Sequence, residues 1–163
     1  MQITIQLKDD QVNRLLSSVT KKLNDLTPLM RQIAGIMHDA VEENFAQGGR
    51  PKWKPSARAL REGGKTLQDT GRLAASITSR ATGNQAMVGT NVVYAAIHQF
   101  GGKTSPHVIK PKTKKALFWP GARHPVKSVN HPGSTIPARP FLSLTEDDWQ
   151  EIREKSAKYL TGL

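Results

Sequence analysis

Apolar and polar residues alternate at the start of the chain and then switch to helical spacing. Ile3, Ile5 and Leu7 alternate with polar neighbours, which predicts a short strand with one buried face. Apolar residues then recur every three or four positions, which predicts a helix capped by Asp9 or Asp10 and contributing to the core. The apolar stripe of this helix comprises Val12, Leu15, Leu16, Val19 and Leu23.

A second helix is predicted after an interruption at residues 26–28. Thr27 as the N-cap and Pro28 at the first helical position favour a helix start, because the amide that Pro lacks has no partner there. The helix is expected to end near Gly48 and Gly49. Its apolar stripe comprises Met30, Ile33, Met37, Val41 and Phe45, and this spacing is typical of a packing surface rather than a cofactor site.

Two prolines interrupt regular structure directly after this helix. Pro51 and Pro55 each restrict the residue before them, so residues 50–55 are predicted to form a loop. Trp53 is the large apolar residue in this loop, and we expect it to anchor the loop in the core.

A helical turn and a hairpin are predicted next. Residues 67–73 favour a capped turn that leads into a short helix. Residues 77–81 and 86–89 flank the polar sequence at 82–85, which is typical of a β-hairpin connection.

A further short helix is predicted within residues 92–100. Tyr94, Ile97 and Gly101 lie about one turn apart, and glycine at the last of these positions is suited to end the helix.

Residues 102–136, called the basic excursion below, are rich in Pro, Lys and His and have only brief apolar runs. So long a stretch is unusual for a passive loop in a compact domain, and it indicates a function. A long hairpin with residues 108–109 and 117–119 as its strands is one structure that fits. Residues 138–142 are expected to return the chain to the core.

The last helix has a complete set of start signals. Thr145 and Asp148 form a capping-box pattern, and Leu144 and Trp149 occupy the positions of a hydrophobic staple. Acidic residues at its start and lysines near its end suit the helix dipole. Its apolar stripe comprises Trp149, Ile152, Tyr159 and Leu163.

These elements predict an α+β fold in which N-terminal and C-terminal amphipathic helices pack on a small antiparallel sheet, with a long basic hairpin or loop at residues 102–136. The 163 residues fit a single domain, 1–163, and suffice for a hydrophobic core. The chain contains no Cys, which excludes disulfides, thiolate catalysis and Cys-ligated metal sites. It also lacks a signal-peptide pattern and the run of roughly 18 apolar residues that a bilayer-spanning helix needs, so we expect a protein made in the cytoplasm.

The positive charge is concentrated in the middle of the sequence. The chain has a formal net charge of +11, with 24 Lys and Arg against 13 Asp and Glu. Residues 70–145 hold ten of these basic residues and no acidic one, so the rest of the chain carries 14 (24 − 10) basic and all 13 acidic residues. Such a segment is expected to attract phosphates or an acidic protein surface; a basic surface that merely keeps the protein soluble is the simpler alternative.

Seven of these basic residues are the candidates for contact with DNA or with a partner. They are Lys103, Lys110, Lys112, Lys114, Lys115, Arg123 and Lys127. Phe118 and Trp119 lie among them, an arrangement typical of salt-sensitive, sequence-independent binding of nucleic acid. The same two aromatic residues would equally suit a core or a subunit interface.

Catalytic motifs are missing from the sequence. There is no His-Glu-x-x-His, no phosphate-binding Gly loop and no Gly-x-Ser-x-Gly. His38, Asp39 and Glu42 share a helix face but match no familiar metal spacing. A metal-dependent hydrolase built on His98, His107, His124 and His131 is the enzymatic alternative, and it would need an almost entirely His-based site because residues 70–145 have no carboxylate. We therefore expect a protein without enzymatic activity, metal or cofactor.

Several short motifs follow one another in a specific order. They are residues 45–55, residues 67–73 with Ser76 and Ile77, residues 88–91, residues 94–102, residues 136–142 and a C-terminal amphipathic helix. In this order they resemble the phage virion morphogenesis family of Mu-like phages, which is related to tail-completion and head–tail joining proteins.

The resemblance implies a small α+β structural protein that forms a ring, a hexamer, in the virion neck after assembly in the host cytoplasm. Its implied partners are further copies of itself, neighbouring neck, connector or tail proteins, and double-stranded DNA in the channel, with no membrane. A sequence-independent nucleic-acid-binding protein is the alternative function. The resemblance implies no catalytic residue and no cofactor. The motif residues that it implies for the fold or an interface are Trp53, Gly71, Tyr94, Ile97, His98, Phe100, Gly101, Arg139 and Phe141.

Within this set, Gly71 and Gly101 are expected to form turns, and Tyr94, Ile97, Phe100 and Phe141 to lie in the core. Arg139 is expected to form a buried or interface charge pair.

Overall fold

The computed structural model describes residues 10–119 and 121–162. The strand predicted at Ile3, Ile5 and Leu7 therefore lies outside the described residues. Internal contacts divide the chain into two compact units, which we call the helical unit (residues 1–92 and 141–163) and the excursion unit (93–140). The elements are helices and short antiparallel strands, which confirms the predicted α+β class.

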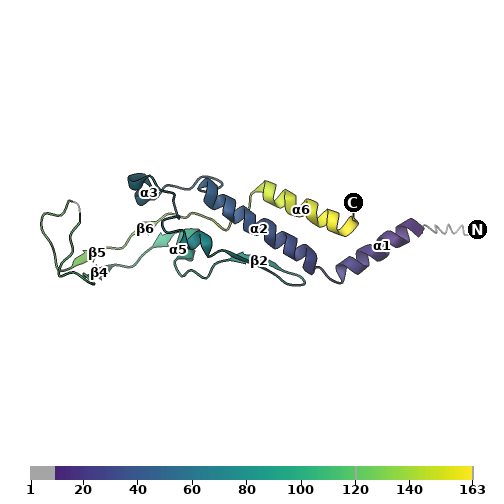
Figure 1. The fold of residues 1–163 in the computed structure, drawn as a ribbon, viewed down its shortest axis with the longest axis horizontal. Helices are drawn as coiled ribbons and strands as arrows, with labels where there is room; N and C mark the ends of the chain where they lie inside the picture. The colour runs from purple at the N-terminus through teal and green to yellow at the C-terminus, as the bar shows by residue number, and fades with distance from the viewer. Residues whose placement is uncertain (1–9, 120, 163) are drawn as a thin grey trace, which may run out of the picture. The chain divides into compact units, whose positions relative to one another are not determined.

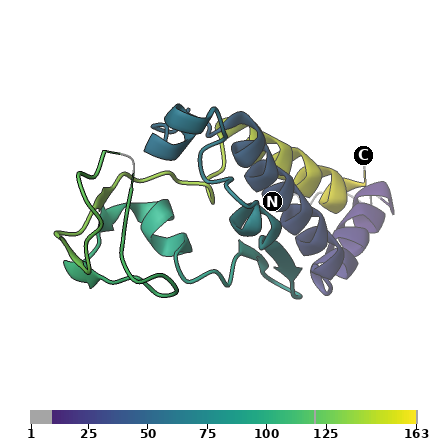
Figure 2. The ribbon, with the colours of Figure 1, turned by 60° about the vertical axis from the view of Figure 1, so that its left-hand side comes forward.

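Three long helices form most of the helical unit: α1 (Asp10–Leu23), α2 (Thr27–Gln47) and α6 (Glu146–Thr161). Helices α2 and α6 lie side by side (Figures 1 and 2). They run antiparallel, because Arg50, just after α2, pairs with Asp148 at the start of α6, while Tyr159 near its end donates a hydrogen bond to Asp25 O, just before α2.

Leu26, rather than Thr27, is the N-cap residue of α2, and its side chain makes no capping hydrogen bond. The Oδ1 of Asp25 accepts a hydrogen bond from the Thr27 amide at 2.9 Å, and Thr27 is the first residue of the helix. The prediction of Thr27 as the N-cap was wrong because a carboxylate two residues earlier satisfies that amide. Gly48 ends the helix in the left-handed conformation (φ 73°), as predicted.

The core of the helical unit is built around three aromatic rings. The Phe45 ring lies 5.8 Å from that of Trp53 and 5.4 Å from that of Phe141, measured between centroids. Phe141 is fully buried and Trp53 is buried, so the loop anchor predicted at Trp53 is confirmed. These contacts tie residues 45–53 to the returning chain at residue 141.

The other elements of the helical unit are short. They are α3 (Ala57–Glu62), α4 (Arg72–Ala75) and a hairpin of β1 (Thr78–Ala81) with β2 (Ala86–Gly89), which packs against α2. The hairpin and the short helix α4 confirm the predictions for residues 67–89.

Helix α1 does not contribute to the core as predicted. None of its residues is buried, and Leu16 is 59% exposed. Among the described residues, α1 contacts α6 close to its own C-terminus, where Lys22 Nζ donates to Leu160 O at 3.3 Å. The apolar stripe of α1 is present as predicted, but the contact of α1 with α6 does not bury it.

The capping box of α6 is present as predicted. The Thr145 side chain accepts from the Asp148 amide, and the Asp148 side chain accepts from the Thr145 amide at 2.7 Å. Ile152 is buried, whereas Trp149 is 48% exposed, so its predicted place on the core stripe was wrong. The physical reason is the helix rotation: Asp148 is directed at Arg50, and Trp149, the next residue, lies about 100° further around the helix. Leu163, the last predicted stripe residue, lies outside the described residues.

The excursion unit contains α5 (Ala95–Phe100) and two short sheets. Strands β3 (Gly102–Lys103) and β6 (Thr135–Ile136) pair antiparallel, as do β4 (His107–Ile109) and β5 (Val129–His131). The partner of β4 was predicted at residues 117–119, which was wrong: Leu117 instead forms an isolated bridge with Val126. Strand β5, which lies further along the chain than residues 117–119, pairs with β4 because this pairing continues the register of β3 with β6.

No helix within residues 10–119 and 121–162 has both the length and the hydrophobicity that crossing a bilayer requires.

Candidate interaction surface

Two glycines fix the base of the basic excursion. A Cβ on Gly101 (φ 73°) would lie 2.8 Å from Ala138 N, and one on Gly133 (φ 89°) would lie 2.1 Å from Thr104 O. Both positions thus combine a left-handed backbone with a close approach of the opposite strand, which only glycine tolerates. Gly101 ends α5 as predicted.

Hydrogen bonds join the two sides of the basic excursion beyond β3 and β6. The Thr104 amide donates to Ser134 O at 2.9 Å, and the Ser134 amide donates to Thr104 Oγ1 at 2.8 Å. At the next pair of strands the rings of His107 and His131 lie 5.1 Å apart, as the register of β4 and β5 requires. The base of the basic excursion is therefore an antiparallel pair of segments, and within residues 110–119 and 121–128 one isolated bridge joins Leu117 to Val126.

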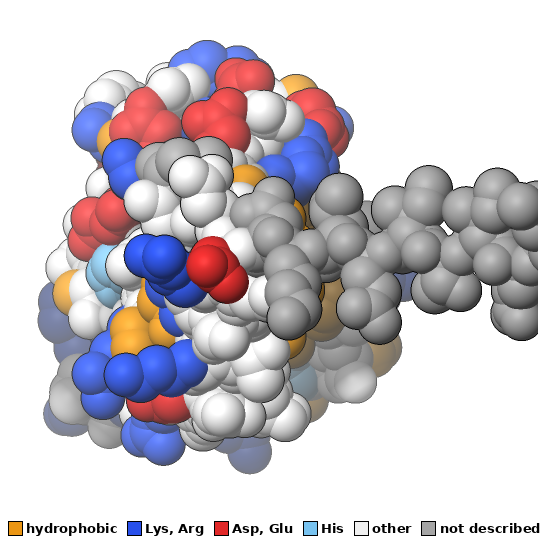
Figure 3. All heavy atoms as spheres, turned by 90° about the vertical axis from the view of Figure 1, so that its right-hand side faces the viewer, with side chains coloured by type: hydrophobic (Ala, Val, Ile, Leu, Met, Phe, Trp, Pro, Cys, Tyr) orange, Lys and Arg blue, Asp and Glu red, His pale blue; other side chains and the backbone are white. Residues whose placement is uncertain are grey.

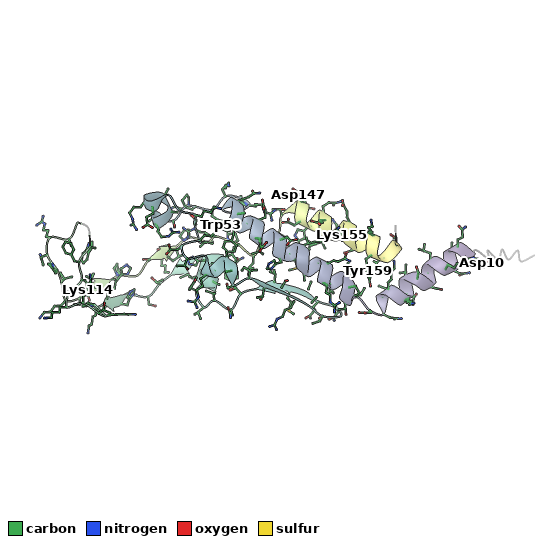
Figure 4. The ribbon with its side chains drawn as sticks, viewed as in Figure 1. Asp10, Trp53, Lys114, Asp147, Lys155 and Tyr159 are labelled. Atoms are coloured by element: carbon green, nitrogen blue, oxygen red, sulfur yellow. The ribbon has the colours of Figure 1, made fainter. Side chains whose placement is uncertain are left out.

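The seven candidate basic residues are all exposed and all belong to the excursion unit. Lys103 lies on β3, and the six others follow β4 in the chain. Lys114 lies in the loop beyond β4 and β5 (Figure 4). By contrast, on the face shown in Figure 3, acidic and basic side chains are interspersed. The described carboxylates all belong to the helical unit, so the charge of the basic excursion is not compensated within its own unit.

Apolar side chains are exposed among these lysines. Phe118 is 67% exposed and Trp119 is 46% exposed. Together with Ile109, Leu117 and Val129 they line a cavity of about 320 Å³. A second cavity of about 330 Å³ shares Leu117 and Phe118, and its lining includes Lys112 and Lys114. The surface thus offers both apolar area and positive charge to a partner.

His98 and Arg139 meet at the base of the excursion unit. The Arg139 amide donates to His98 O at 2.7 Å, and the Arg139 residue is 5% exposed, as expected for a buried charge. Burial, and secondly the charge of Arg139, lower the pKa of the His98 imidazole below its ordinary value of 6.5. Burial also lowers the pKa of the Arg139 guanidinium. His98 is accordingly neutral at neutral pH, with its ring edge-to-face against Tyr94 at 5.9 Å.

The remaining motif residues are distributed over both units. Trp53, Gly71 and Phe141 belong to the helical unit. Phe100 is 78% exposed and Tyr94 is 41% exposed, so their predicted core positions were wrong. Helix α5 has only six residues and buries Ala95, which leaves these aromatic side chains on its outer faces.

The described residues do not form a metal site. Within residues 10–119 and 121–162, no group of three or more His, Cys, Asp or Glu side chains could hold a metal ion. His107 Nδ1 is 3.0 Å from Ser105 O, and His131 Nδ1 accepts from the Gly133 amide, so backbone contacts account for one nitrogen of each ring.

Sequence reasoning missed a polar network inside the helical unit. Asn44 is fully buried, and its Nδ2 donates to Phe141 O at 2.9 Å and to Ser143 O at 2.8 Å. Its Oδ1 accepts from Arg50 Nε at 2.9 Å. An Asn on the same helical stripe as Phe45 and Val41 is the sequence signal that points to it.

Comparison with known proteins identifies the family of the chain. The model of the phage virion morphogenesis family matches residues 7–161. The chain is 40% identical over 158 residues to the Mu-like prophage FluMu G protein 2 of Haemophilus influenzae, which covers 96% of this chain and 95% of that protein. No solved structure matches the chain. On the strength of a match along nearly its whole length, the chain belongs to the phage virion morphogenesis family.

Proposed function

We propose that this protein is a structural, non-enzymatic component of the phage neck that completes the tail or joins head and tail as a ring around the DNA channel. Family membership supports a role in virion morphogenesis. The observation that carries the finer proposal is the basic excursion, which presents seven exposed Lys and Arg side chains and no carboxylate. A ring of such excursions attracts DNA phosphates or the acidic surface of a neighbouring protein.

Genetic complementation tests the proposal. A phage whose copy of the gene is disrupted would be supplied with the wild-type chain or with the Lys112→Gln, Lys114→Gln, Lys115→Gln variant. We expect the variant to fold but to yield heads and tails that remain unjoined in electron micrographs. The matched control, Lys65→Gln with Arg72→Gln and Arg80→Gln, removes three exposed charges outside the excursion and should restore infectious particles.

Two results would contradict the proposal. Normal joined particles from the excursion variant would remove the assigned role of the basic residues. Unjoined particles from the control as well would mean that total charge, rather than the excursion, is required.

A free nucleic-acid-binding protein is the second candidate function, and the exposed Phe118 and Trp119 among lysines favour it. Gel shifts with duplex and single-stranded DNA across a salt series would separate the two. Tight binding by a monomer, with a steep loss of affinity as salt rises, would favour this second function.

A further inference from the structure

Residues 109–119 and 121–129, called the tip below, hold an apolar cavity beside a basic one. The apolar cavity, of about 320 Å³, is lined almost entirely by apolar groups, which belong to Ile109, Leu117, Phe118, Trp119 and Val129. The second cavity, of about 330 Å³, shares Leu117 and Phe118 with the first, and its lining also includes Lys112 and Lys114. A ligand that fills the apolar cavity therefore has lysines directly beside it.

Strand pairing builds one side of the apolar cavity. Ile109 and Val129 are direct partners in the register of β4 and β5, so their side chains point to the same face of this two-stranded sheet. Val108, the residue before Ile109, points to the opposite face and is not part of the lining. The bridge between Leu117 and Val126 holds the segment that supplies the other side. The cavity is thus formed by paired backbone segments.

The surface around this cavity is both apolar and positively charged. The aromatic side chains that line it are exposed, with Phe118 at 67% and Trp119 at 46%. Adjacent exposed aromatic residues of this size are typical of a binding surface. Residues 93–140 contain no Asp or Glu, so the charge of the lysines is not compensated within the excursion unit. A complementary ligand combines a large apolar group with negative charge.

We propose that the tip binds an acidic segment of a different protein and holds one large apolar side chain of that segment in the cavity. The apolar side chain contacts Phe118 and Trp119, and the neighbouring carboxylates contact Lys112 and Lys114. This assignment rests on the proposed function, since the protein that carries the segment is a neighbour in the neck.

DNA matches only part of this surface. The phosphates of a duplex pair with lysines, but its bases are stacked inside the helix and do not fill an apolar cavity. A base of single-stranded DNA has hydrogen-bonding groups along its edge, and burying them against an almost entirely apolar lining is unfavourable. An acidic peptide supplies carboxylates and an apolar side chain on neighbouring residues, so it satisfies both cavities.

The described segments of this chain that come closest to such a ligand do not fit. The exposed Trp149 of α6 has Glu146 and Arg153 about one turn away on either side, and these two side chains pair with each other. Beside the exposed Leu60 of α3, the carboxylate of Glu62 already contacts two arginines. The acidic residue in the first turn of α1 lies on the side of that helix opposite its apolar stripe. The segment is therefore assigned to another protein.

A selection from random peptides tests the chemistry of the partner. The full-length chain would be immobilised and mixed with a library of mRNA-displayed random peptides. We expect the enriched peptides to share a large apolar residue flanked by Asp or Glu. The same selection on the Lys112→Gln, Lys114→Gln chain should retain the apolar residue and lose the acidic ones. Peptides enriched on the wild type without a shared apolar residue, or without acidic residues, would overturn the proposal.

Two phenylalanines of the excursion unit test the site. The affinity of an enriched peptide, labelled with fluorescein, would be measured by fluorescence anisotropy. Phe118→Ala should weaken binding by about tenfold or more, because it removes a wall that both cavities share. Phe100→Ala removes an exposed ring that lines neither cavity and should change the affinity by less than about twofold. Equal effects of the two substitutions would overturn the assigned site.

The lysines are tested with the same peptide. Lys112→Gln with Lys114→Gln should weaken binding by about tenfold at low salt and remove most of its salt dependence. The control, Lys65→Gln with Arg80→Gln, removes two exposed charges of the helical unit and should leave both quantities nearly unchanged. Equal weakening by the two pairs would mean that net charge attracts the peptide, which contradicts the proposal.

The other occupants give different results. If Phe118→Ala weakens the binding of labelled DNA, duplex or single-stranded, as strongly as it weakens the binding of the peptide, the cavity belongs to DNA. If sedimentation velocity shows self-association of the wild type that Phe118→Ala abolishes, the cavity belongs to a second copy. Either result would overturn the assignment to a different protein.

Complementation separates this proposal from the proposed function. Phe118→Ala should leave heads and tails unjoined, whereas Phe100→Ala should restore infectious particles. If Phe118→Ala gives joined particles and the Lys112→Gln, Lys114→Gln, Lys115→Gln variant does not, the apolar contact is wrong while the role of the basic excursion stands. If both give joined particles, both proposals fail.

Discussion

Arg50 and Asp148 form a two-point ion pair in the helical unit, with Nη2–Oδ2 at 2.9 Å and Nη1–Oδ1 at 3.3 Å. Both side chains are largely buried, with 19% and 13% exposed. Arg50 also donates to Asn44 Oδ1 and to Ala40 O, so one guanidinium joins the end of α2 to the start of α6. Asp148 belongs at the same time to the capping box with Thr145.

Removal of the Asp148 carboxylate should destabilise the helical unit strongly. We expect Asp148→Ala to lower the free energy of unfolding by about 2–4 kcal/mol, because it removes a cap and leaves the Arg50 charge partly buried without its partner. Asp147→Ala, an exposed neighbour in the same first turn, should cost less than about 1 kcal/mol. Urea unfolding followed by circular dichroism measures both values, and equal losses would show that the ion pair does not matter.

The same carboxylate should make stability depend on acid pH. Burial opposes ionisation of Asp148, but hydrogen bonds from Thr145 and the contact with Arg50 outweigh it and hold its pKa below the ordinary value of 3.8. A carboxyl with a lowered pKa in the fold stabilises it fully above its unfolded pKa, and this stabilisation is lost as pH falls through the folded pKa. We expect the unfolding free energy to drop below about pH 4 in the wild type.

Asp148→Asn provides the control for this pH dependence, since asparagine does not titrate. The variant should be less stable at pH 6 and should lose less stability between pH 5 and pH 2 in the same urea titrations. A pH profile parallel to that of the wild type would exclude Asp148 as its source.

Two phenylalanines offer a matched test of burial. Phe141 is fully buried against Phe45, whereas Phe100 is 78% exposed. Phe141→Ala should cost about 3–5 kcal/mol of stability through lost transfer free energy and a residual cavity. Phe100→Ala should cost less than about 0.5 kcal/mol, as surface substitutions do. A large loss at Phe100 would mean that its ring is covered in the folded chain in solution.

Two glycines of the excursion unit offer a matched test of its antiparallel strand pairing. Gly133 (φ 89°) and Gly121 (φ 94°) are both left-handed, so alanine should cost about 1–2 kcal/mol of local strain at either. Only at Gly133 would the new Cβ also meet the backbone, 2.1 Å from Thr104 O, since nothing lies within 4 Å at Gly121. Gly133→Ala should therefore separate the strands, and limited proteolysis should cut residues 102–136 much faster than in Gly121→Ala. Equal cleavage rates would contradict the close approach.

The sequence by itself determined the local elements and the place of the charge. Helices α2 and α6, the β1–β2 hairpin, the capping box and the loop at Trp53 follow from spacing, caps and turn residues, all of which act within a few residues. The absence of acids from residues 70–145 likewise requires no coordinates.

Tertiary structure alone decided which distant residues meet. The partner of β4 is β5, whose paired residues lie twenty or more positions away, because strand register is set by pairing and not by local preference. The same holds for the hydrogen bond and ion pair that join Asn44, Arg50 and Asp148, which depend on how α2 and α6 pack together. It also holds for the exposure of Phe100 and Trp149. The stripe of α1 is the clearest case: its spacing established an apolar face, but only the fold showed that α6 leaves that face uncovered.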